Sequence, residues 1–307
     1  MTVAIISHPD CLLHDMGDNH LEAPARIGVI AEAIYRSDIK PKIKNYLAPL
    51  ADKAVLSKLH APNYIDELWQ LSPQQGLLAL DPDTRMNPYT LTAARRAAGA
   101  ARLAVDLVMQ QKAAAAFCNI RPPGHHAEYA RAMGFCFFNN VMLAVHHVLQ
   151  QYHLKRVAII DFDVHHGNGT QDLLGNNSQV LFCSSFEYPL FPFSGIETTS
   201  KNTLNLALAP GTTGRDYRKL VRELWWPALR EFRPEMIFIS AGFDGHLDDP
   251  LGDLQLTDAD YFWITQQLKS IADFYCQGRI VSVLEGGYAL PALASSALAH
   301  VRALVSQ

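Results

Sequence analysis

The sequence predicts an α/β protein built on a mostly parallel β-sheet. Its apolar strand candidates lack polar alternation, which is typical of strands buried on both faces. Segments with helical apolar spacing separate these strands, as the crossovers of a parallel sheet require. Of the 307 residues, 49% are hydrophobic and 18% charged, enough for a large core, and no repeat, linker or charge run divides them. We therefore expect residues 1–307 to form a single domain.

The first half of the chain combines short strands and helices with a long polar loop. An apolar run at residues 1–6 predicts the first strand, and the turn-rich residues 8–26 predict an ordered loop. Apolar spacing and helix propensity predict helices at residues 27–35, 53–60, 63–71 and 91–110. A turn is expected at residues 78–84. The apolar residues 113–120 predict another strand, which stops at the turn before His125 and His126.

The second half alternates strands and helices more regularly. The expected strands are residues 157–166, 180–185, 203–207, 236–240 and 279–284. The expected helices are residues 141–151, 214–232 and 258–276. Thr257 is the expected N-cap of the last helix, because Asp260 follows three residues later as in a capping box.

Composition and charge argue against several classes of protein. A formal net charge of −4 provides no basic surface for nucleic acid or anionic membranes. Five cysteines, none in a Cys-x-x-Cys pair, indicate neither a disulfide framework nor a thiolate zinc site, and they fit the reducing cytoplasm. The sequence contains no run of about 18 apolar residues, the length needed to predict a membrane span. We expect a soluble, cytoplasmic protein whose oligomeric state the sequence leaves open.

Polar residues at the ends of two buried strands predict a metal site. Asp161, Asp163 and His165 occupy alternate positions, so a continuous strand would place them on one face. Asp244 follows the strand at residues 236–240, and ligands of open α/β sheets bind at such carboxyl ends. Asp163, His165 and Asp244 offer oxygen and nitrogen ligands and leave positions for water and substrate, which is typical of a catalytic zinc.

Two other interpretations stay open at this point. The Asp and His side chains could simply cap neighbouring loops at the end of the strand. His8, Cys11 and His14, at three-residue steps in the first loop, could hold a second metal, although they contribute one sulfur and show no helical pattern.

A rigid turn presents two adjacent histidines. The Pro-Pro-Gly sequence before His125 and His126 restricts the backbone, so the pair is held stiffly. One imidazole of a contacting pair tends to stay neutral near pH 7 and can act as a general base. Tyr288, which follows two glycines, can donate a phenolic hydrogen bond to a developing oxyanion. Together with the metal, these groups imply hydrolysis of an amide without a covalent intermediate.

Four motifs together resemble those of the zinc-dependent histone deacetylase family, which includes bacterial histone deacetylase-like amidohydrolases and acetylpolyamine amidohydrolases. The motifs are Arg121-Pro-Pro-Gly-His-His-Ala127, Asp161-x-Asp-x-His-His-Gly-Asn168, Ala241-Gly-Phe-Asp244 and Glu285-Gly-Gly-Tyr288. Matching positions extend from His8 to Tyr288, nearly the whole chain. The resemblance implies an arginase/deacetylase-like fold, with a mostly parallel, eight-stranded sheet and helices on both faces.

The same resemblance implies roles for individual residues. His126 would be the general base and acid, His125 would help to orient the water, and Tyr288 would polarise the carbonyl group. The implied Zn²⁺ ligands are Asp163, His165 and Asp244. Asp161 would support the first histidine.

The resemblance also implies a structural K⁺ site and a substrate tunnel. The implied K⁺ residues are Asp161, Asp163, His165, Ser184 and Ser185. The tunnel for an acyl-lysine-like chain would be formed by Gly134, Phe135, Phe191 and, at its rim, Leu251. Arg26 matches the family's internal-channel arginine only weakly.

Two positions bear on the reaction and the substrate. Asn168 stands where many members pair an aspartate with the second histidine, and a neutral amide stabilises imidazolium less, so the pKa of His126 should be lower. Leu251 stands where a specialised polyamine deacetylase has a glutamate, which favours acetyl-lysine-type substrates. Acidic residues that could still attract a cationic substrate are Asp15, Asp18, Glu22, Asp83 and Asp248.

The expected function is zinc-dependent hydrolysis of an N-acetyl amide, with acetate released from an acetylated lysine or a small acetylated amine. Acetylpolyamine hydrolysis is the alternative within the same class. A non-catalytic acyl-lysine binder and a binuclear manganese hydrolase of the arginase type are the alternatives from other classes. The complete set of catalytic positions argues against the binder, and the histidine pair with Tyr288 argues against the arginase type.

Overall fold

Eight parallel strands form the main sheet of the computed structural model, which describes residues 2–197 and 200–306. They are β1 (Val3–Ser7), β2 (Ile43–Leu47), β5 (Ala115–Cys118), β6 (Val157–Asp161), β7 (Val180–Glu187), β8 (Thr203–Leu208), β9 (Met236–Ala241) and β10 (Ile280–Leu284). Their order is β2-β1-β5-β10-β9-β6-β7-β8. A separate antiparallel pair joins β3 (Leu78–Ala79) and β4 (Arg85–Met86). The predicted single α/β domain with an eight-stranded parallel sheet is confirmed.

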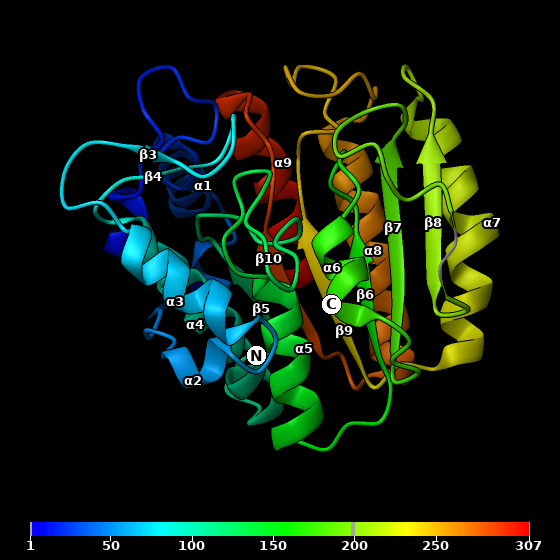
Figure 1. The fold of residues 1–307 in the computed structure, drawn as a ribbon. Coiled ribbons are helices and arrows are strands. Elements are labelled where there is room, and N and C mark those ends of the chain that lie inside the picture. The colour runs from blue at the N-terminus through cyan, green and yellow to red at the C-terminus, as the bar shows by residue number, and fades with distance from the viewer. Residues whose placement is uncertain (1, 198–199, 307) are drawn as a thin grey trace.

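Helices cover both faces of this sheet (Figure 1). One face packs against α1 (Ala25–Arg36), α7 (Gly214–Phe232), α8 (Asp258–Tyr275) and α9 (Leu290–Val305). The other face packs against α4 (Thr90–Met109), α5 (Asn140–Gln151) and α6 (Asn168–Leu174). The short helices α2 (Lys53–Leu56) and α3 (Pro62–Leu71) form a smaller apolar cluster with α4. Two 3₁₀ turns occur at Pro9–Leu12 and Lys40–Lys42.

The continuous apolar sequence of the central strands follows from this double coverage. Ile159 of β6 packs into the cluster with α4 and α5, whereas Ile160 packs into the cluster with α7 and α8. Both side chains are fully buried. Burying one such side chain stabilises the fold by about 1.5–3 kcal/mol. Both faces of these strands therefore carry mainly apolar side chains.

Apart from the two 3₁₀ turns, five elements are not predicted by the sequence patterns: the short pair β3 and β4, strand β2, and helices α6 and α9. Strand β2 lies at the edge of the sheet and exposes polar side chains, which obscures its apolar pattern. Helix α6 contains only seven residues, too few to show a helical period. Helix α9 is a regular helix that the sequence analysis leaves unassigned.

Two expected elements end four or five residues earlier than expected. The strand expected at residues 157–166 ends at Asp161, and the residues that follow form a turn before α6. The helix expected at residues 53–60 ends at Leu56. By contrast, the capping box of Thr257 and Asp260 at the start of α8 is present.

The chain order of the strands produces a switch point between β6 and β9. These strands are neighbours, but the chain continues from β6 to β7 and β8 on one side and from β9 to β10 on the other. The two connections therefore diverge at the carboxyl ends of the strands, toward the top of Figure 1. Ligands of open α/β sheets bind at such points.

Among the described residues, no helix is both long enough and apolar enough to cross a membrane. All five cysteines are free and buried.

Candidate active site

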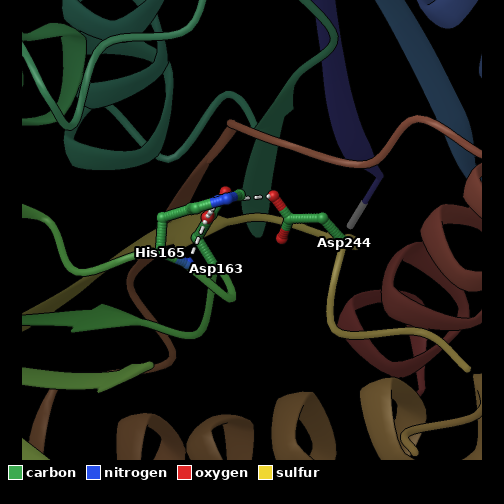
Figure 2. Close-up of side chains that lie close together, drawn as sticks. All are labelled: Asp163, His165 and Asp244. Atoms are coloured by element: carbon green, nitrogen blue, oxygen red, sulfur yellow. Dashed lines mark hydrogen bonds and ion pairs between the residues drawn. The ribbon is translucent and has the colours of Figure 1, made fainter. Parts of the chain in front are cut away.

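Asp163, His165 and Asp244 meet at the switch point between β6 and β9 (Figure 2). His165 Nδ1 lies 3.0 Å from Asp163 Oδ1 and 3.1 Å from Asp244 Oδ2. All three residues are buried, with 8% exposure for His165 and less for the others. Across residues 2–197 and 200–306, this is the single group of His, Cys, Asp and Glu that could hold a metal ion, with ligand atoms within 4.8 Å of one another. The structure thus brings the three predicted metal ligands together.

Backbone amides and glycines hold the two carboxylates in place. Gly286 N donates to Asp163 Oδ2 at 2.8 Å, and Val164 N donates to Asp244 Oδ1 at 2.9 Å. A Cβ atom at Gly286 would overlap both carboxylates, so the backbone can approach them only as glycine. Each carboxylate keeps its second oxygen directed at His165.

The charge of this group suits a cation. Burial lowers the pKa of His165, but hydrogen bonds to Asp163 and Asp244 outweigh it and raise the pKa to about 10. Burial and the Asp163 charge raise the pKa of Asp244 to about 7. The buried carboxylates therefore hold a proton on His165, in the place where a divalent cation would bind. One imidazole nitrogen and two carboxylate oxygens fit Zn²⁺, and three protein ligands leave an open position.

The grouping of these ligands does not arise from strand alternation. Because β6 ends at Asp161, a shared strand face for Asp161, Asp163 and His165 is wrong. Asp161 Oδ2 lies 3.0 Å from His125 Nδ1, whereas the turn after β6 directs Asp163 and His165 toward Asp244. The Asp161 carboxylate therefore lies beside the first histidine, where a supporting group is expected.

The two adjacent histidines lie side by side, with ring centroids 4.0 Å apart. His125 Nδ1 faces the Asp161 carboxylate, while His126 Nδ1 lies 2.7 Å from Asn168 Oδ1. The backbone N of His125 donates to Glu285 Oε2 at 3.1 Å. One histidine thus has a carboxylate partner and the other an amide partner.

These surroundings move the pKa values of the two histidines in opposite directions. Burial lowers the pKa of His125, but the charges of Asp163 and Asp161 outweigh it and raise the pKa to about 10. Burial, followed by the charges of His125 and His165, holds the pKa of His126 well below its usual value. The expected direction for His126 is thus found, but burial and neighbouring imidazoles are its causes, since the Asn168 hydrogen bond raises this pKa.

Tyr288 borders the site from the loop after β10. Its ring lies 6.0 Å from the Phe135 ring and 4.9 Å from Arg26 Cζ. Burial raises the pKa of the phenol well above 10, so the hydroxyl group stays protonated and can donate a hydrogen bond. The buried Arg26 donates to the backbone oxygen of Gly287 at 2.7 Å and thereby supports this loop.

A cavity of about 250 Å³ connects these groups to the surface. Its polar walls include His125, His126, His165 and Tyr288. The four predicted tunnel residues, Gly134, Phe135, Phe191 and Leu251, also line it. The Phe191 ring lies 5.1 Å from the His126 ring, so an apolar wall adjoins the polar groups.

The residues expected at a K⁺ site come from β6, from the turn after it and from the neighbouring β7, but their side chains do not all face the same way. Asp161 of β6 is directly opposite Ser184 of β7. Ser184 Oγ is buried and has no hydrogen-bond partner among the described residues. Ser185 Oγ instead donates to Tyr217 Oη at 3.5 Å, so the two serine side chains take opposite faces of the strand.

The acidic residues expected to attract a cation divide into three kinds. Glu22 cannot do so, because it is fully buried and its carboxylate binds Arg121 and Arg26. Asp15, Asp18 and Asp248 are exposed and are not part of the cavity wall. Asp83 does line the cavity.

The alternative metal site in the first loop is not assembled. Cys11 is fully buried, and burial raises the pKa of its thiol to about 11. His14 Nδ1 lies 2.8 Å from Thr90 Oγ1. Cys11 and His14 therefore contribute to packing in the described structure.

Several site residues are missed by the sequence analysis. Leu190 also lines the cavity, and Asp249 accepts hydrogen bonds from the loop that carries Tyr288. The Asp-Pro pair before Leu251 is a turn signal that could have drawn attention to Asp249. Leu190 lies in the apolar, proline-bracketed loop of residues 186–195, and the apolar character of this loop is the signal that could have identified it.

The parallel α/β fold, with a candidate metal centre at its switch point, agrees with comparisons to known proteins. The chain belongs to the histone deacetylase family, because residues 20–304 match the family model of the histone deacetylase domain. The motif resemblance is therefore confirmed. Membership of this family indicates that the protein is a deacetylase, and hence a hydrolase.

Three relatives illustrate the similarity. A probable deacetylase of Archaeoglobus fulgidus is 35% identical over 301 residues, with 94% of this chain and 82% of that protein covered. The polyamine deacetylase HDAC10 of Mus musculus is 34% identical over 332 residues, with 99% of this chain and 48% of that protein covered. The crystal structure of the HDA15 HD domain matches with a TM-score of 0.92 and 31% identity, covering 99% of this chain and 88% of that one.

Proposed function

We propose that this protein is a zinc-dependent amidohydrolase that removes the acetyl group from an N-acetylated amine, preferably an acetyl-lysine-type substrate. One observation carries the proposal: the buried Asp-His-Asp group, the histidine pair and Tyr288 converge on one cavity. The family match over residues 20–304 supports one deacetylase domain. The free, buried cysteines support a reducing compartment such as the cytoplasm.

Asp163, His165 and Asp244 are the proposed Zn²⁺ ligands. When bound, Zn²⁺ supplies polarisation of a carbonyl oxygen and lowers the pKa of a water molecule toward about 7. Side chains of the protein supply the proton transfer and the stabilisation of negative charge.

His126 is the proposed general base and acid. Its lowered pKa keeps the imidazole neutral near pH 7, so Nε2 can accept a proton from the attacking water. The same nitrogen then returns this proton to the leaving amine as the C–N bond breaks and acetate forms. His125, protonated beside Asp161, orients the water and stabilises the negative charge of the transition state.

Tyr288 is the proposed oxyanion donor. Its phenol remains protonated at neutral pH and can donate to the carbonyl oxygen as negative charge develops there. Such a donor contributes about 2.7–4 kcal/mol to transition-state stabilisation.

A structural K⁺ ion near Asp161 and Ser184 is a further part of the proposal. The buried, unpartnered Ser184 Oγ supports it, because a buried hydroxyl without a partner is costly and an ion would satisfy it. Asp163, His165 and Ser185 complete the proposed ion surroundings through backbone or side-chain oxygens.

The apolar wall favours a slender aliphatic chain in the cavity. Phe135, Phe191 and Leu251 enclose such a chain but offer no charged partner for a distal ammonium group. Asp83 also lines the cavity, and it does not belong to the proposed metal ligands. Its carboxylate could bind the ammonium group of an acetylpolyamine, so acetylpolyamines are the second candidate substrates.

Parallel kinetics on an acetyl-lysine peptide and on acetylputrescine test the proposal. We expect a higher kcat/KM on the peptide. A preference for acetylputrescine of about tenfold, which is roughly 1.4 kcal/mol in the transition state, would favour the polyamine alternative. Binding without turnover would indicate an acyl-lysine binder, and two metal ions per chain would indicate the arginase type.

A further inference from the structure

An amide supports the second histidine, and a carboxylate supports that amide. Asn168 Oδ1 lies 2.7 Å from His126 Nδ1, and Asn168 Nδ2 donates to Glu128 Oε1 at 2.7 Å. Met133 Sδ accepts from the same nitrogen at 3.3 Å. Since Asn168 is only 9% exposed, these protein groups dominate its surroundings. His126, Asn168 and Glu128 therefore form a continuous chain of hydrogen bonds.

The orientation of the Asn168 amide determines which nitrogen of His126 carries hydrogen. With Oδ1 toward His126, Nδ1 of the imidazole donates and Nε2 is free to accept a proton. With Nδ2 toward His126, Nδ1 must accept and the hydrogen is placed on Nε2. A carboxylate partner has no such wrong orientation, because both of its oxygens accept. In a serine-protease triad, replacing the aspartate with asparagine lowers kcat by about 10⁴-fold through the wrong tautomer.

We propose that Glu128 is a positioning residue that sets the tautomer of His126 through Asn168. A carboxylate can only accept, so Glu128 requires Nδ2 of Asn168 on its own side and leaves Oδ1 for His126. The inference rests on the proposed function in one respect, namely that His126 Nε2 accepts the proton.

The backbone around Glu128 is held firmly enough for this task. Glu128 N donates to the backbone oxygen of Arg131 at 3.0 Å. His60 Nε2 accepts a hydrogen bond from Asn139 N at 3.0 Å, so His60 Nδ1 carries hydrogen and donates to Glu128 O at 2.9 Å. The carboxylate of Glu128 is therefore presented to Asn168 by a segment fixed on both sides.

Kinetics of Glu128→Ala give the first test. We expect kcat on the acetyl-lysine peptide to fall about tenfold or more, with KM changed by less than about twofold. Asp172→Ala is the matched control, because Asp172 Oδ2 accepts from Tyr129 N at 2.8 Å and ties the same segment to α6 without a hydrogen bond to the Asn168 side chain. An equal loss of kcat in both variants would overturn the proposal, since Glu128 would then only hold the segment.

Repeating Glu128→Ala in an Asn168→Asp background gives a sharper test. With a carboxylate at residue 168 there is no amide to orient, and Glu128 would face a like charge. The Glu128→Ala change should therefore leave kcat unchanged or raise it in this background. A merely structural role would produce the same fractional loss in both backgrounds, and that result would refute the inference.

The tautomer can also be observed directly in the zinc-loaded protein. Long-range ¹H–¹⁵N spectra of histidine-labelled protein, assigned with His126→Ala, distinguish Nδ1–H from Nε2–H imidazole. We expect Nδ1–H in the unmodified protein and in Asp172→Ala, and a shift toward Nε2–H in Glu128→Ala. An unchanged tautomer in Glu128→Ala contradicts the inference. This readout needs no turnover, so it separates failure of the inference from failure of the proposed deacetylase activity.

Discussion

The carboxylate of Asp249 accepts a 2.6 Å hydrogen bond from the backbone amide of Tyr288. It also accepts from the backbone amides of Ala289 and Leu251, each at 3.1 Å. One buried side chain thus connects the proposed oxyanion donor to the rim of the cavity.

Replacing this carboxylate should loosen the tyrosine. Asp249→Asn exchanges an accepting oxygen for an amide donor, which cannot bind a backbone N–H. We expect kcat to fall about tenfold, because small displacements of a catalytic group are costly. The exposed neighbour provides the control Asp248→Asn. A lower unfolding temperature with unchanged kcat would limit Asp249 to a role in folding.

Tyr288→Phe removes the phenolic hydroxyl and keeps the ring between Phe135 and Arg26. Because the proposed role of the hydroxyl is to donate to the oxyanion of the transition state, we expect kcat to fall about a hundredfold or more while KM changes little. Steady-state kinetics on the acetyl-lysine peptide separate the two parameters. A raised KM with normal kcat would mean that Tyr288 contributes to substrate binding alone.

Asp244→Ala should lose metal and activity together. The variant removes one of the three proposed ligands and leaves His165 with a single carboxylate partner. Elemental analysis should find about one zinc per chain in the unmodified protein and in the control Asp248→Ala, but far less in Asp244→Ala. Full zinc content and turnover in Asp244→Ala would contradict the ligand assignment.

Metal affinity should depend on pH because His165 binds a proton in the same place. Its pKa is raised to about 10, so below that pH a metal ion must displace this proton. Zinc affinity should therefore increase about tenfold per pH unit between pH 7 and 8, with about one proton released. It should increase more steeply below pH 7, where the Asp244 carboxyl is protonated as well. Titration calorimetry in buffers of different ionisation enthalpy measures the release. An affinity independent of pH would exclude this competition.

The rim residue Leu251 should influence the choice of amine. Leu251→Glu places a carboxylate at the cavity and should shift the ratio of kcat/KM toward acetylputrescine by about tenfold, through a charge-assisted contact. Leu247→Glu adds the same charge at an exposed leucine outside the cavity wall and serves as control. Equal shifts in both variants would point to general electrostatic attraction instead.

The sequence predicts this site well where the chemistry is local. Asp163 and His165 follow a strand whose apolar run is unmistakable, and the Pro-Pro-Gly turn identifies His125 and His126 as a rigid pair. Contacts between residues far apart in the sequence could not be predicted. Nothing near Glu128 in the sequence indicates Asn168, which is 40 positions away. Glu22 looks like a surface acid until the structure shows that it is enclosed by Arg121 and Arg26.

Edge position and tight backbone approach explain the remaining differences. Strand β2 lies at the edge of the sheet, pairs only with β1 and exposes the adjacent polar residues Lys44 and Asn45, so its sequence resembles a loop. The overlap that a side chain at Gly286 would cause is likewise invisible before β9 and β10 are paired.

The switch point between β6 and β9 also has a consequence for assembly of the molecule. Asp163 and His165 precede Asp244 by about 80 residues, and the intervening chain must complete β7, β8 and α7 before β9 returns beside β6. Contacts of such long sequence separation form slowly, because the entropy of closing the intervening loop opposes them. We therefore expect metal binding to follow the pairing of β9 with β6. A bound ion would then link the part of the sheet that continues through β7 and β8 to the part that continues through β10.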